Sequence, residues 1–151
     1  MFSRSSGYAI QALTYLASQP SGRLVGAREI ATSLDIPMPF LRKILRKLSQ
    51  QKLVRSFKGV RGGYELARPA SSIRMSEILQ IGHDNQTGGK CVLGLTLCND
   101  AQPCPLHAHW KDIRELIEKR IKSTRLSDLA RNARAGAGNR SKRMAASGAG
   151  G

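Results

Sequence analysis

Three cysteines lie close together in the second half of the chain, and two histidines follow them. Cys91, Cys98 and Cys104 are all the cysteines of the protein, and His107 and His109 come shortly after the last one. An odd number of cysteines grouped in this way is not typical of a secreted disulfide framework. Thiolate sulfur is a soft ligand that suits iron-sulfur clusters, zinc and copper(I), and an imidazole can complete a set of four ligands. We therefore expect a metal-binding segment.

The spacing of these cysteines distinguishes between kinds of metal centre. Structural zinc sites usually contain cysteine pairs separated by two to four residues. The gaps between the three cysteines here are six and five residues. This wide spacing favours a larger object, such as an iron-sulfur cluster, and free cysteines without a metal are the simpler alternative.

Positive charge is concentrated in the first half of the chain. The 151 residues carry a net charge of +15 at pH 7. Residues 1–70 contain 12 Lys and Arg against 3 Asp and Glu, an excess of +9. The excess is +1 for residues 71–123, from 7 against 6, and +5 for residues 124–151, from 6 against 1. A basic part followed by a nearly neutral part predicts that the first part meets phosphate, with nucleic acid as the leading partner.

The basic region has the pattern of a helix-turn-helix. A first helix is expected over residues 8–18, before a turn at residues 19–22, and a second helix begins near Ala27. The second ends before Pro37, and a third starts at Pro37 to Pro39, because proline is tolerated in the first turn of a helix. Two short helices joined by a tight turn are typical of a DNA-binding motif.

The third helix has one apolar face and one basic face. Its apolar residues have helical spacing and are expected to pack inward: Leu41, Ile44, Leu45 and Leu48. Its basic residues occupy the other side: Arg42, Lys43, Arg46 and Lys47. A charged face is usually only solvated, but such faces mix signs so that i,i+4 ion pairs form. Four cations without a carboxylate favour a face that contacts phosphate.

A β-hairpin is predicted directly after the third helix. Residues 52–58 and 64–68 alternate with the period of a strand, and the glycines between them supply the backbone freedom that a hairpin turn requires. Lys58 and Arg61 lie at its tip. A basic hairpin that follows a helix-turn-helix indicates the wing of a winged-helix protein.

The last predicted helix spans residues 106–123. An apolar stripe runs along it, formed by Trp110, Ile113, Leu116, Ile117 and Ile121. The rest of the helix carries glutamate and lysine at i,i+4 spacing. Little of the chain remains to cover this stripe, so we expect it to pack against its copy in a homodimer. The alternative is that it folds back on the first helix in a monomer.

These observations give a mainly α fold with a small β-hairpin and four parts. We expect a winged helix-turn-helix domain over residues 1–82, a cysteine-containing segment over 83–105, a dimerisation helix over 106–123 and a basic disordered tail over 124–151. No stretch approaches the roughly 20 apolar residues of a membrane-spanning helix. The first residues resemble an amphipathic core helix more than a signal peptide, and we expect a cytoplasmic protein.

The combined motifs over residues 1–123 resemble the Rrf-two family of bacterial winged-helix regulators. The resemblance rests on residues 7–9, on Ile36, Pro37, Phe40 and Leu41 at the start of the third helix, on Gly59, Arg61, Gly62, Gly63 and Tyr64 in the wing, and on the three cysteines before a long helix. The resemblance implies a homodimer in which the state of an iron-sulfur cluster changes the affinity for DNA.

The resemblance also implies roles for individual residues. Cys91, Cys98 and Cys104 match the three cluster ligands, and His107 matches the histidine that completes a 2Fe-2S cluster. Some relatives use a carboxylate from the first helix of the other subunit, but this chain has no Asp or Glu before Glu29. His109, or an external ligand on a 4Fe-4S cluster, is the remaining alternative to His107.

The sequence therefore predicts a transcriptional regulator, such as a repressor, that binds double-stranded DNA and senses redox state, iron or nitric oxide. The residues expected to contact DNA are Pro39, Arg42, Lys43, Arg46, Lys47, Lys58, Arg61 and Gly62. Two alternatives are a winged-helix regulator without a cluster and a nucleic-acid-binding protein with a structural zinc ion. An enzyme is not expected, because no phosphate-binding loop or pair of carboxylates occurs.

Overall fold

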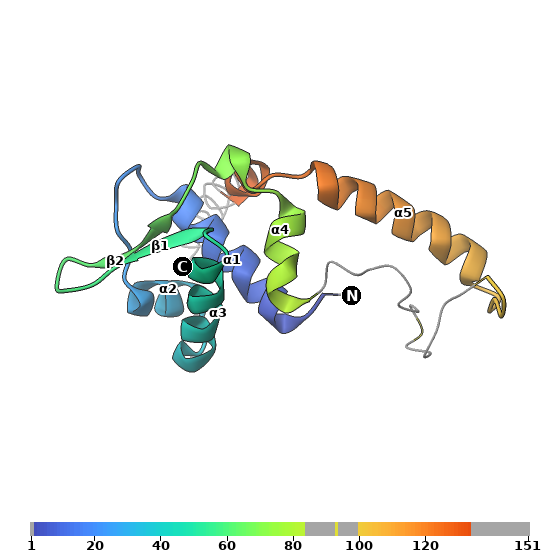
Figure 1. Ribbon diagram of the computed structural model, residues 1–151, viewed down its shortest axis with the longest axis horizontal. Helices are drawn as coiled ribbons and strands as arrows, with labels where there is room; N and C mark the ends of the chain where they lie inside the picture. The colour runs from blue at the N-terminus through green and yellow to red at the C-terminus, as the bar shows by residue number, and fades with distance from the viewer. Residues whose placement is uncertain (1, 84–92, 94–99, 134–151) are drawn as a thin grey trace, which may run out of the picture.

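Helices and a two-stranded hairpin form the body of the molecule, and a long helix extends from it (Figure 1). The computed structural model describes residues 2–83, 93 and 100–133. The elements in chain order are α1 (Arg4–Ser18), α2 (Ala27–Leu34), α3 (Met38–Gln50), β1 (Val54–Phe57), β2 (Gly63–Leu66), η1 (Ala70–Ser72), α4 (Met75–Leu79), η2 (Gln80–Gly82) and α5 (His107–Ser123). The predicted winged helix-turn-helix with a long C-terminal helix is confirmed.

The first helix begins four residues earlier than the apolar pattern predicts. Ser3 precedes α1, and its hydroxyl oxygen accepts a hydrogen bond of 3.2 Å from the backbone N–H of Ser6. This cap satisfies one of the N–H groups that lack a partner in the first turn of a helix. Polar residues can thus occupy the first turn, and only the following turns show the apolar stripe that is buried in the core.

The turn between α2 and α3 is short because of two local features. Asp35 ends α2 in the left-handed conformation, with a φ of 52°. The next residue, Ile36, is buried, and its N–H donates to the carbonyl of Ala31 at 3.0 Å. Pro37 then precedes α3, whose first turn contains Pro39. The chain therefore reverses within a few residues and brings α3 back against α1 and α2.

Burial of one face of α3 forms the centre of the core. Leu41, Leu45 and Leu48 are fully buried, and Ile44 is nearly so. They pack with Leu13 of α1 and with apolar residues from α2, β1, α4 and η2. Burying an aliphatic side chain of this size contributes roughly 1.5–3 kcal/mol, so this stripe is a large part of the driving force for folding.

The wing is an antiparallel hairpin that is joined to the body by a third segment of extended chain. Val54 pairs with Leu66 at one end of the hairpin and Phe57 pairs with Gly63 at the other. Tyr64 also pairs with Val25, and the two residues exchange backbone hydrogen bonds of 2.8 and 3.0 Å. The base of the wing is therefore fixed to the segment that precedes α2, and its direction relative to the helix-turn-helix is set.

The chain after α5 returns to the body, which corrects the prediction of a disordered tail over residues 124–151. The N–H of Met75 donates to the carbonyl of Thr124, and the N–H of Leu126 donates to the carbonyl of Ile73, both at 2.9 Å. Residues 126–133 are helical, and Leu126 is fully buried in the core. The basic composition of this stretch conceals a few apolar residues that are enough to anchor it, and residues 134–151 lie outside the described part.

The sequence predicts that the chain contains no membrane-spanning helix. In the part of the chain that the structure describes, no helix combines the length and the apolar character that a bilayer crossing requires.

Gly63 is expected to be required for the fold because of its contact with Val25. Its φ is +155°, and a Cβ there would lie 2.9 Å from backbone atoms of Val25. We expect Gly63→Ala to lower the free energy of unfolding by about 1–3 kcal/mol, measured by urea denaturation. The control is Gly7→Ala, because Gly7 lies within α1 with open space around it. That variant should be more stable than the wild type by about 0.5–1 kcal/mol, and equal stability of the two variants would contradict this account.

Candidate DNA-binding surface and cysteine segment

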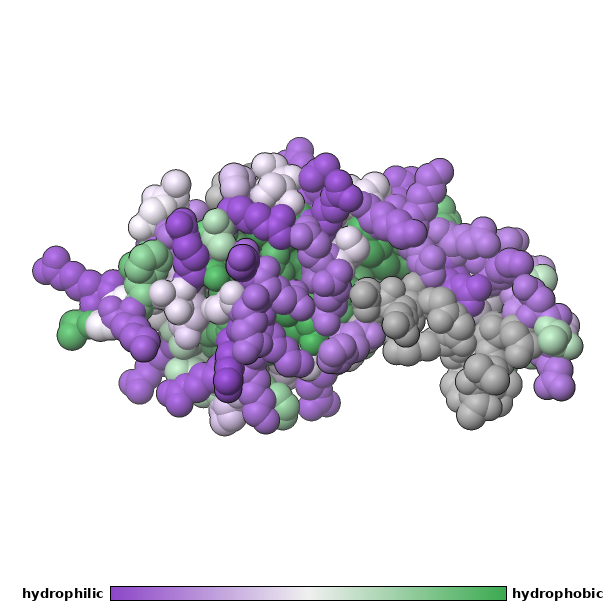
Figure 2. All heavy atoms as spheres, viewed as in Figure 1, coloured by the Kyte–Doolittle hydropathy of each residue, from purple (hydrophilic) through white to green (hydrophobic). Residues whose placement is uncertain are grey.

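The exposed face of α3 carries cations that have no partner among the residues that the structure describes. Arg42, Lys43 and Arg46 are exposed, and none of them makes an ion pair or a side-chain hydrogen bond with another residue in the described ranges. Hydrophilic side chains predominate on the surface over α3, whereas the wing shows both hydrophilic and hydrophobic ones (Figure 2). Unpaired cations gathered on one helix face create the positive potential that attracts a polyanion.

Most of the carboxylates in the winged-helix module are paired elsewhere. Residues 2–83 contain the four acidic residues Glu29, Asp35, Glu65 and Glu77. Three of them form ion pairs with Arg23, Arg55 and Arg68. None of these arginines belongs to α3 or to the tip of the wing. The acidic residues therefore neutralise cations away from the basic face and leave that face positive.

Glu29 also connects α1 to α2. Its carboxylate accepts hydrogen bonds from Arg23 at 2.8 and 3.0 Å and from the Tyr15 hydroxyl at 3.0 Å. The hydrogen bond from Arg23, followed by that from Tyr15, lowers the pKa of Glu29 below its usual value. The carboxylate thus stays ionised at neutral pH and holds the first two helices of the motif together.

Lys47 is an exception among the four basic residues predicted to face DNA. Its side chain is half-buried, and its Nζ donates a hydrogen bond of 3.2 Å to the carbonyl of Ile81 in η2. The side chain is directed along the flank of α3 toward η2 and not out from the exposed face. Lys47 therefore has a hydrogen-bond partner within the fold, and its contact with DNA stays a prediction.

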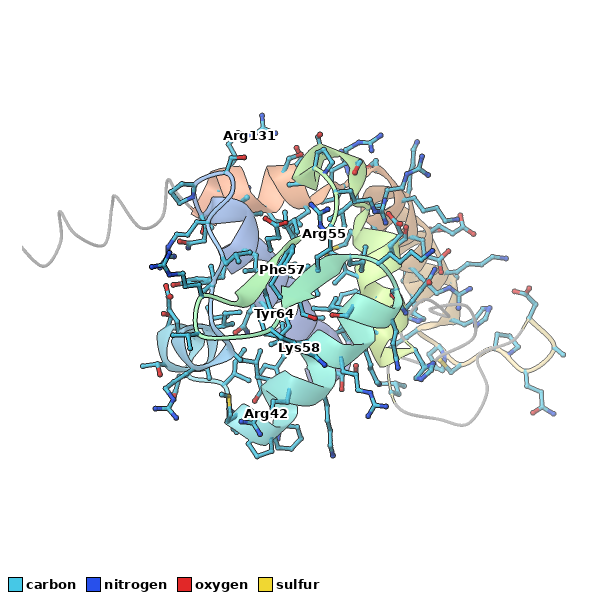
Figure 3. All side chains as sticks on the ribbon, turned by 60° about the vertical axis from the view of Figure 1, so that its left-hand side comes forward. Arg42, Arg55, Phe57, Lys58, Tyr64 and Arg131 are labelled. Atoms are coloured by element: carbon cyan, nitrogen blue, oxygen red, sulfur yellow. The ribbon has the colours of Figure 1, made fainter. Side chains whose placement is uncertain are left out.

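The wing presents two further exposed cations at its tip. Lys58 and Arg61 flank Val60, which is fully exposed. Figure 3 shows Lys58 on the side of the molecule that also carries Arg42, whereas Arg131 lies at the opposite edge. The helix and the wing thus present cations on the same side of the molecule.

Gly62 has a steric role in the wing. A Cβ at this position would collide with the backbone carbonyl of Phe57, and its N–H donates to the carbonyl of Gly59 at 3.0 Å. The absence of a side chain therefore allows the turn to close. A contact of Gly62 with DNA would depend on this closed turn.

Two aromatic residues that meet at the start of α3 were not among the predicted site residues. Phe40 is about half exposed, and its ring lies edge-on to that of Tyr8, with centroids 6.4 Å apart and an interplanar angle of 62°. This contact joins the first turn of α3 to α1. Phe40 is a large apolar residue, and hydropathy alone predicts a buried position for it. The sequence therefore carries no signal that its ring is partly exposed.

The structure describes only part of the cysteine segment. Cys91 and Cys98 lie outside the described residues, and Cys104 is half-buried. His107 is the first residue of α5, and its backbone N–H donates a hydrogen bond of 2.9 Å to the backbone carbonyl of Cys104. These two predicted ligands are therefore one turn apart at the same end of α5. Among the described residues, no group of three or more His, Cys, Asp or Glu could hold a metal ion.

An acidic residue not predicted as part of the site contacts His107. The His107 side chain is buried, and its Nε2 lies 3.0 Å from Oδ1 of Asp100. The pKa of Asp100 is lowered, first by its hydrogen bond with His107 and then by the charge of Lys111. Metal-bound histidines often use their second ring nitrogen to contact a carboxylate, so Asp100 could orient the His107 ring. His109, the alternative ligand, is exposed.

Comparison with known proteins agrees with this geometry. The Rrf2 family, described as an iron-dependent transcriptional regulator, matches residues 2–132. The chain belongs to the Rrf2 family. It is therefore a transcriptional regulator, and the resemblance to the Rrf-two family inferred from the motifs is confirmed. Members of this family regulate transcription and are not enzymes.

Individual relatives agree with the family assignment. A candidate HTH-type transcriptional regulator of Aquifex aeolicus is 36% identical over 131 residues, covering 85% of this chain and 90% of the relative. The transcriptional regulator IscR of Cereibacter sphaeroides is 34% identical over 131 residues, covering 83% of each protein. The solved structure of CymR, the global cysteine regulator of B. subtilis, superposes with a TM-score of 0.70 at 23% identity and covers 87% of this chain and 97% of CymR. The last likeness concerns the fold alone.

Proposed function

We propose that this Rrf2 protein is a homodimeric regulator that binds double-stranded DNA through α3 and the wing, and whose affinity depends on an iron-sulfur cluster held by the cysteine segment. The observation that carries the DNA-binding part is a group of cations on one side of the winged-helix module that have no partner in the described part of the chain. Arg42, Lys43 and Arg46 come from α3, and Lys58 and Arg61 come from the wing.

The two basic elements contact different parts of a duplex. An α-helix fits the major groove of B-form DNA, and the first turns of α3 carry Pro39, Arg42 and Lys43. The wing is held at its base by the pairing of Tyr64 with Val25. It therefore holds Lys58 and Arg61 in a fixed direction, where they contact phosphates or the neighbouring minor groove.

The long helix α5 is the proposed dimer interface. Ile113 is 49% exposed and Leu116 is 59% exposed. Both belong to a helix that extends from the body of the protein (Figure 1). A groove of about 340 Å³ lies between α5 and the start of α4, lined mainly by apolar residues that include Phe2, Met75 and Leu116. A second copy of the same helix would cover these side chains. The two-fold symmetry would also match two half-sites one turn of DNA apart.

The donor set of the cysteine segment fits an iron-sulfur cluster. Cys104 and His107 lie at the same end of α5, and Cys91 and Cys98 would supply the other two ligands. Three thiolates with one imidazole form a soft set of four ligands, and Asp100 would hold the His107 ring. When bound, the cluster would supply a group that responds to redox state, iron or nitric oxide.

Lys47 provides a route between the cysteine segment and α3. Its hydrogen bond to the carbonyl of Ile81 joins the middle of α3 to η2, and η2 ends at Gly82, just before the cysteine segment. A change in that segment would move η2, and this hydrogen bond would transmit the movement to α3. The affinity for DNA would then follow the state of the segment.

A regulator that lacks a cluster is the second candidate. It is supported by the likeness in fold to CymR, which is named as a cysteine regulator. A structural zinc ion bound by the same cysteines is the third. Both keep the DNA-binding surface unchanged and differ only in what the cysteine segment binds.

The salt dependence of DNA binding distinguishes a cation that neutralises phosphate from a structural lysine. We expect Arg46→Ala to reduce the slope of log affinity against log salt by about 0.9 for each phosphate that is no longer neutralised, and so by about 1.8 for a dimer. The matched control is Lys47→Met, which removes the adjacent cation. It should leave the slope unchanged and lower the free energy of unfolding by about 1 kcal/mol, because the Ile81 carbonyl loses its donor.

These slopes can be measured by fluorescence anisotropy with a mixed-sequence duplex. Equal slopes for the wild type and Arg46→Ala would contradict the proposed role of α3. A reduced slope for Lys47→Met would contradict the structural role of that lysine.

The dimer interface is tested with a charge on the exposed stripe of α5. Leu116→Glu would place an unpaired carboxylate in the proposed interface, where its desolvation opposes association. We expect the dissociation constant of the dimer to rise at least tenfold, a change of about 1.4 kcal/mol, measured by sedimentation equilibrium. The neighbouring polar position provides the control, because Glu115→Ala should leave the dimer intact. A wild-type protein that sediments as a monomer would refute the proposal.

Purification without oxygen distinguishes the three candidates for the cysteine segment: an iron-sulfur cluster, a structural zinc ion and no metal. An iron-sulfur protein should be brown, absorb visible light and contain iron and sulfide. Cys104→Ser should lose the colour and the iron. His83→Asn is the control, because it changes the first residue of the segment, which is not a predicted ligand, to a residue that tolerates the left-handed conformation found there. A colourless protein with bound zinc would favour the structural zinc ion, and a metal-free protein would favour the regulator without a cluster.

A further inference from the structure

The first three turns of α3 present a restricted set of chemical groups to a ligand. The exposed polar side chains in this part of the helix are Arg42, Lys43 and Arg46. Arginine and lysine side chains only donate hydrogen bonds. The first exposed side chain with an acceptor oxygen on α3 is Gln50, at the end of the helix. The base-facing part of α3 therefore offers donors and no acceptors.

The four bases differ in what they require from such a surface. In the major groove, guanine presents two acceptors, N7 and O6, and pairs with arginine or lysine. Adenine presents an acceptor beside a donor and is read by the amide of Asn or Gln, and cytosine presents a donor that is read by a carboxylate. Thymine presents a single acceptor, O4, beside its methyl group. Guanine is therefore the base that best matches a side chain that only donates, because it alone presents two acceptors and no donor.

We propose that Arg42 and Lys43 read guanine and that they set the sequence preference of this regulator. This inference rests on the proposed DNA-binding function and names the base that the helix recognises. Residues near the start of a recognition helix contact base edges, and both cations lie within the first six residues of α3. Neither has a competing partner among the described residues, so their donors are available.

The other basic residues of the surface have different roles. Lys47 donates to the carbonyl of Ile81 and is not available for a base. Arg46 lies one turn after Arg42, closer to the C-terminal end of α3, and binds a phosphate. Lys58 and Arg61 belong to the wing, outside the groove that α3 occupies. Guanine recognition is therefore assigned to two adjacent residues, and affinity that does not depend on sequence is assigned to the other three free cations.

The experiment combines selection of binding sites with a single-atom change in DNA. The full-length protein selects duplexes from a random pool, and the best site is resynthesised with 7-deazaguanine at each conserved guanine in turn. This analogue lacks the N7 acceptor and keeps the Watson–Crick edge. We expect conserved guanines in each half-site and a loss of affinity of about tenfold at the guanines read by Arg42 and Lys43.

Three variants show which residue reads which guanine. With Arg42→Ala, one guanine should lose its conservation, and 7-deazaguanine at that position should have no further effect. Lys43→Ala should do the same at a neighbouring guanine. Arg46→Ala should weaken binding to all sites alike and keep both guanines. All three residues are exposed and have no partner within residues 2–83, 93 and 100–133, so the variants should fold as the wild type does, which circular dichroism can check.

The outcomes separate this inference from the proposed function. Selected sites without conserved guanines would overturn the inference, as would a penalty for 7-deazaguanine that is the same in the wild type and in both reader variants. In those cases DNA binding itself would stand. Failure to bind any duplex would overturn the proposed function, and the inference with it.

Discussion

Burial of the apolar stripe of α3 fixes the orientation of the whole DNA-binding surface. Once Leu41, Leu45 and Leu48 pack against α1 and α2, the helix can no longer rotate, and the opposite face must meet solvent. The basic residues are then held on that face by the same periodicity that buries the leucines. A rotation of α3 by one residue position would bury cations in the core, which is energetically unfavourable when they have no partners there. The core therefore determines what the protein can bind.

The distribution of carboxylates completes this effect. Glu29, Glu65 and Glu77 each pair with an arginine that lies away from the basic face. These exposed or half-exposed ion pairs add little to stability. Their larger effect is on the electrostatic potential, because they consume negative charge at the sides of the module and leave α3 and the wing tip uncompensated. Positive charge is thus concentrated where a duplex would lie.

Local patterns predicted the helices and the wing, because the apolar periodicity of α3 and the glycines of the hairpin depend on near neighbours. The contacts that the sequence did not reveal are those between distant segments. Lys47 has the composition of a DNA contact, and only the position of Ile81, 34 residues later, shows that its ammonium is used within the fold. Leu126 lies in a basic stretch that resembles a disordered tail, yet it is buried against the segment around Ile73. The Ser3 cap was missed because a cap depends on a few polar atoms and leaves no mark in hydropathy.

The way α5 is attached constrains how a sensing segment can act on DNA binding. Its C-terminal end is fixed to the module by the backbone hydrogen bonds that join Thr124 to Met75 and Leu126 to Ile73. Its N-terminal end carries His107, and the 17 residues of the helix span roughly 25 Å between the two ends. A helix that is fixed at one end moves with the module as a rigid lever. In the proposed dimer, a change in ligation at the His107 end would alter the angle between the two modules, and with it the spacing of the two α3 helices. Because a dimer would have to meet two half-sites at the spacing of one DNA turn, a small change in that angle would be enough to change affinity without altering any residue of the DNA-binding surface.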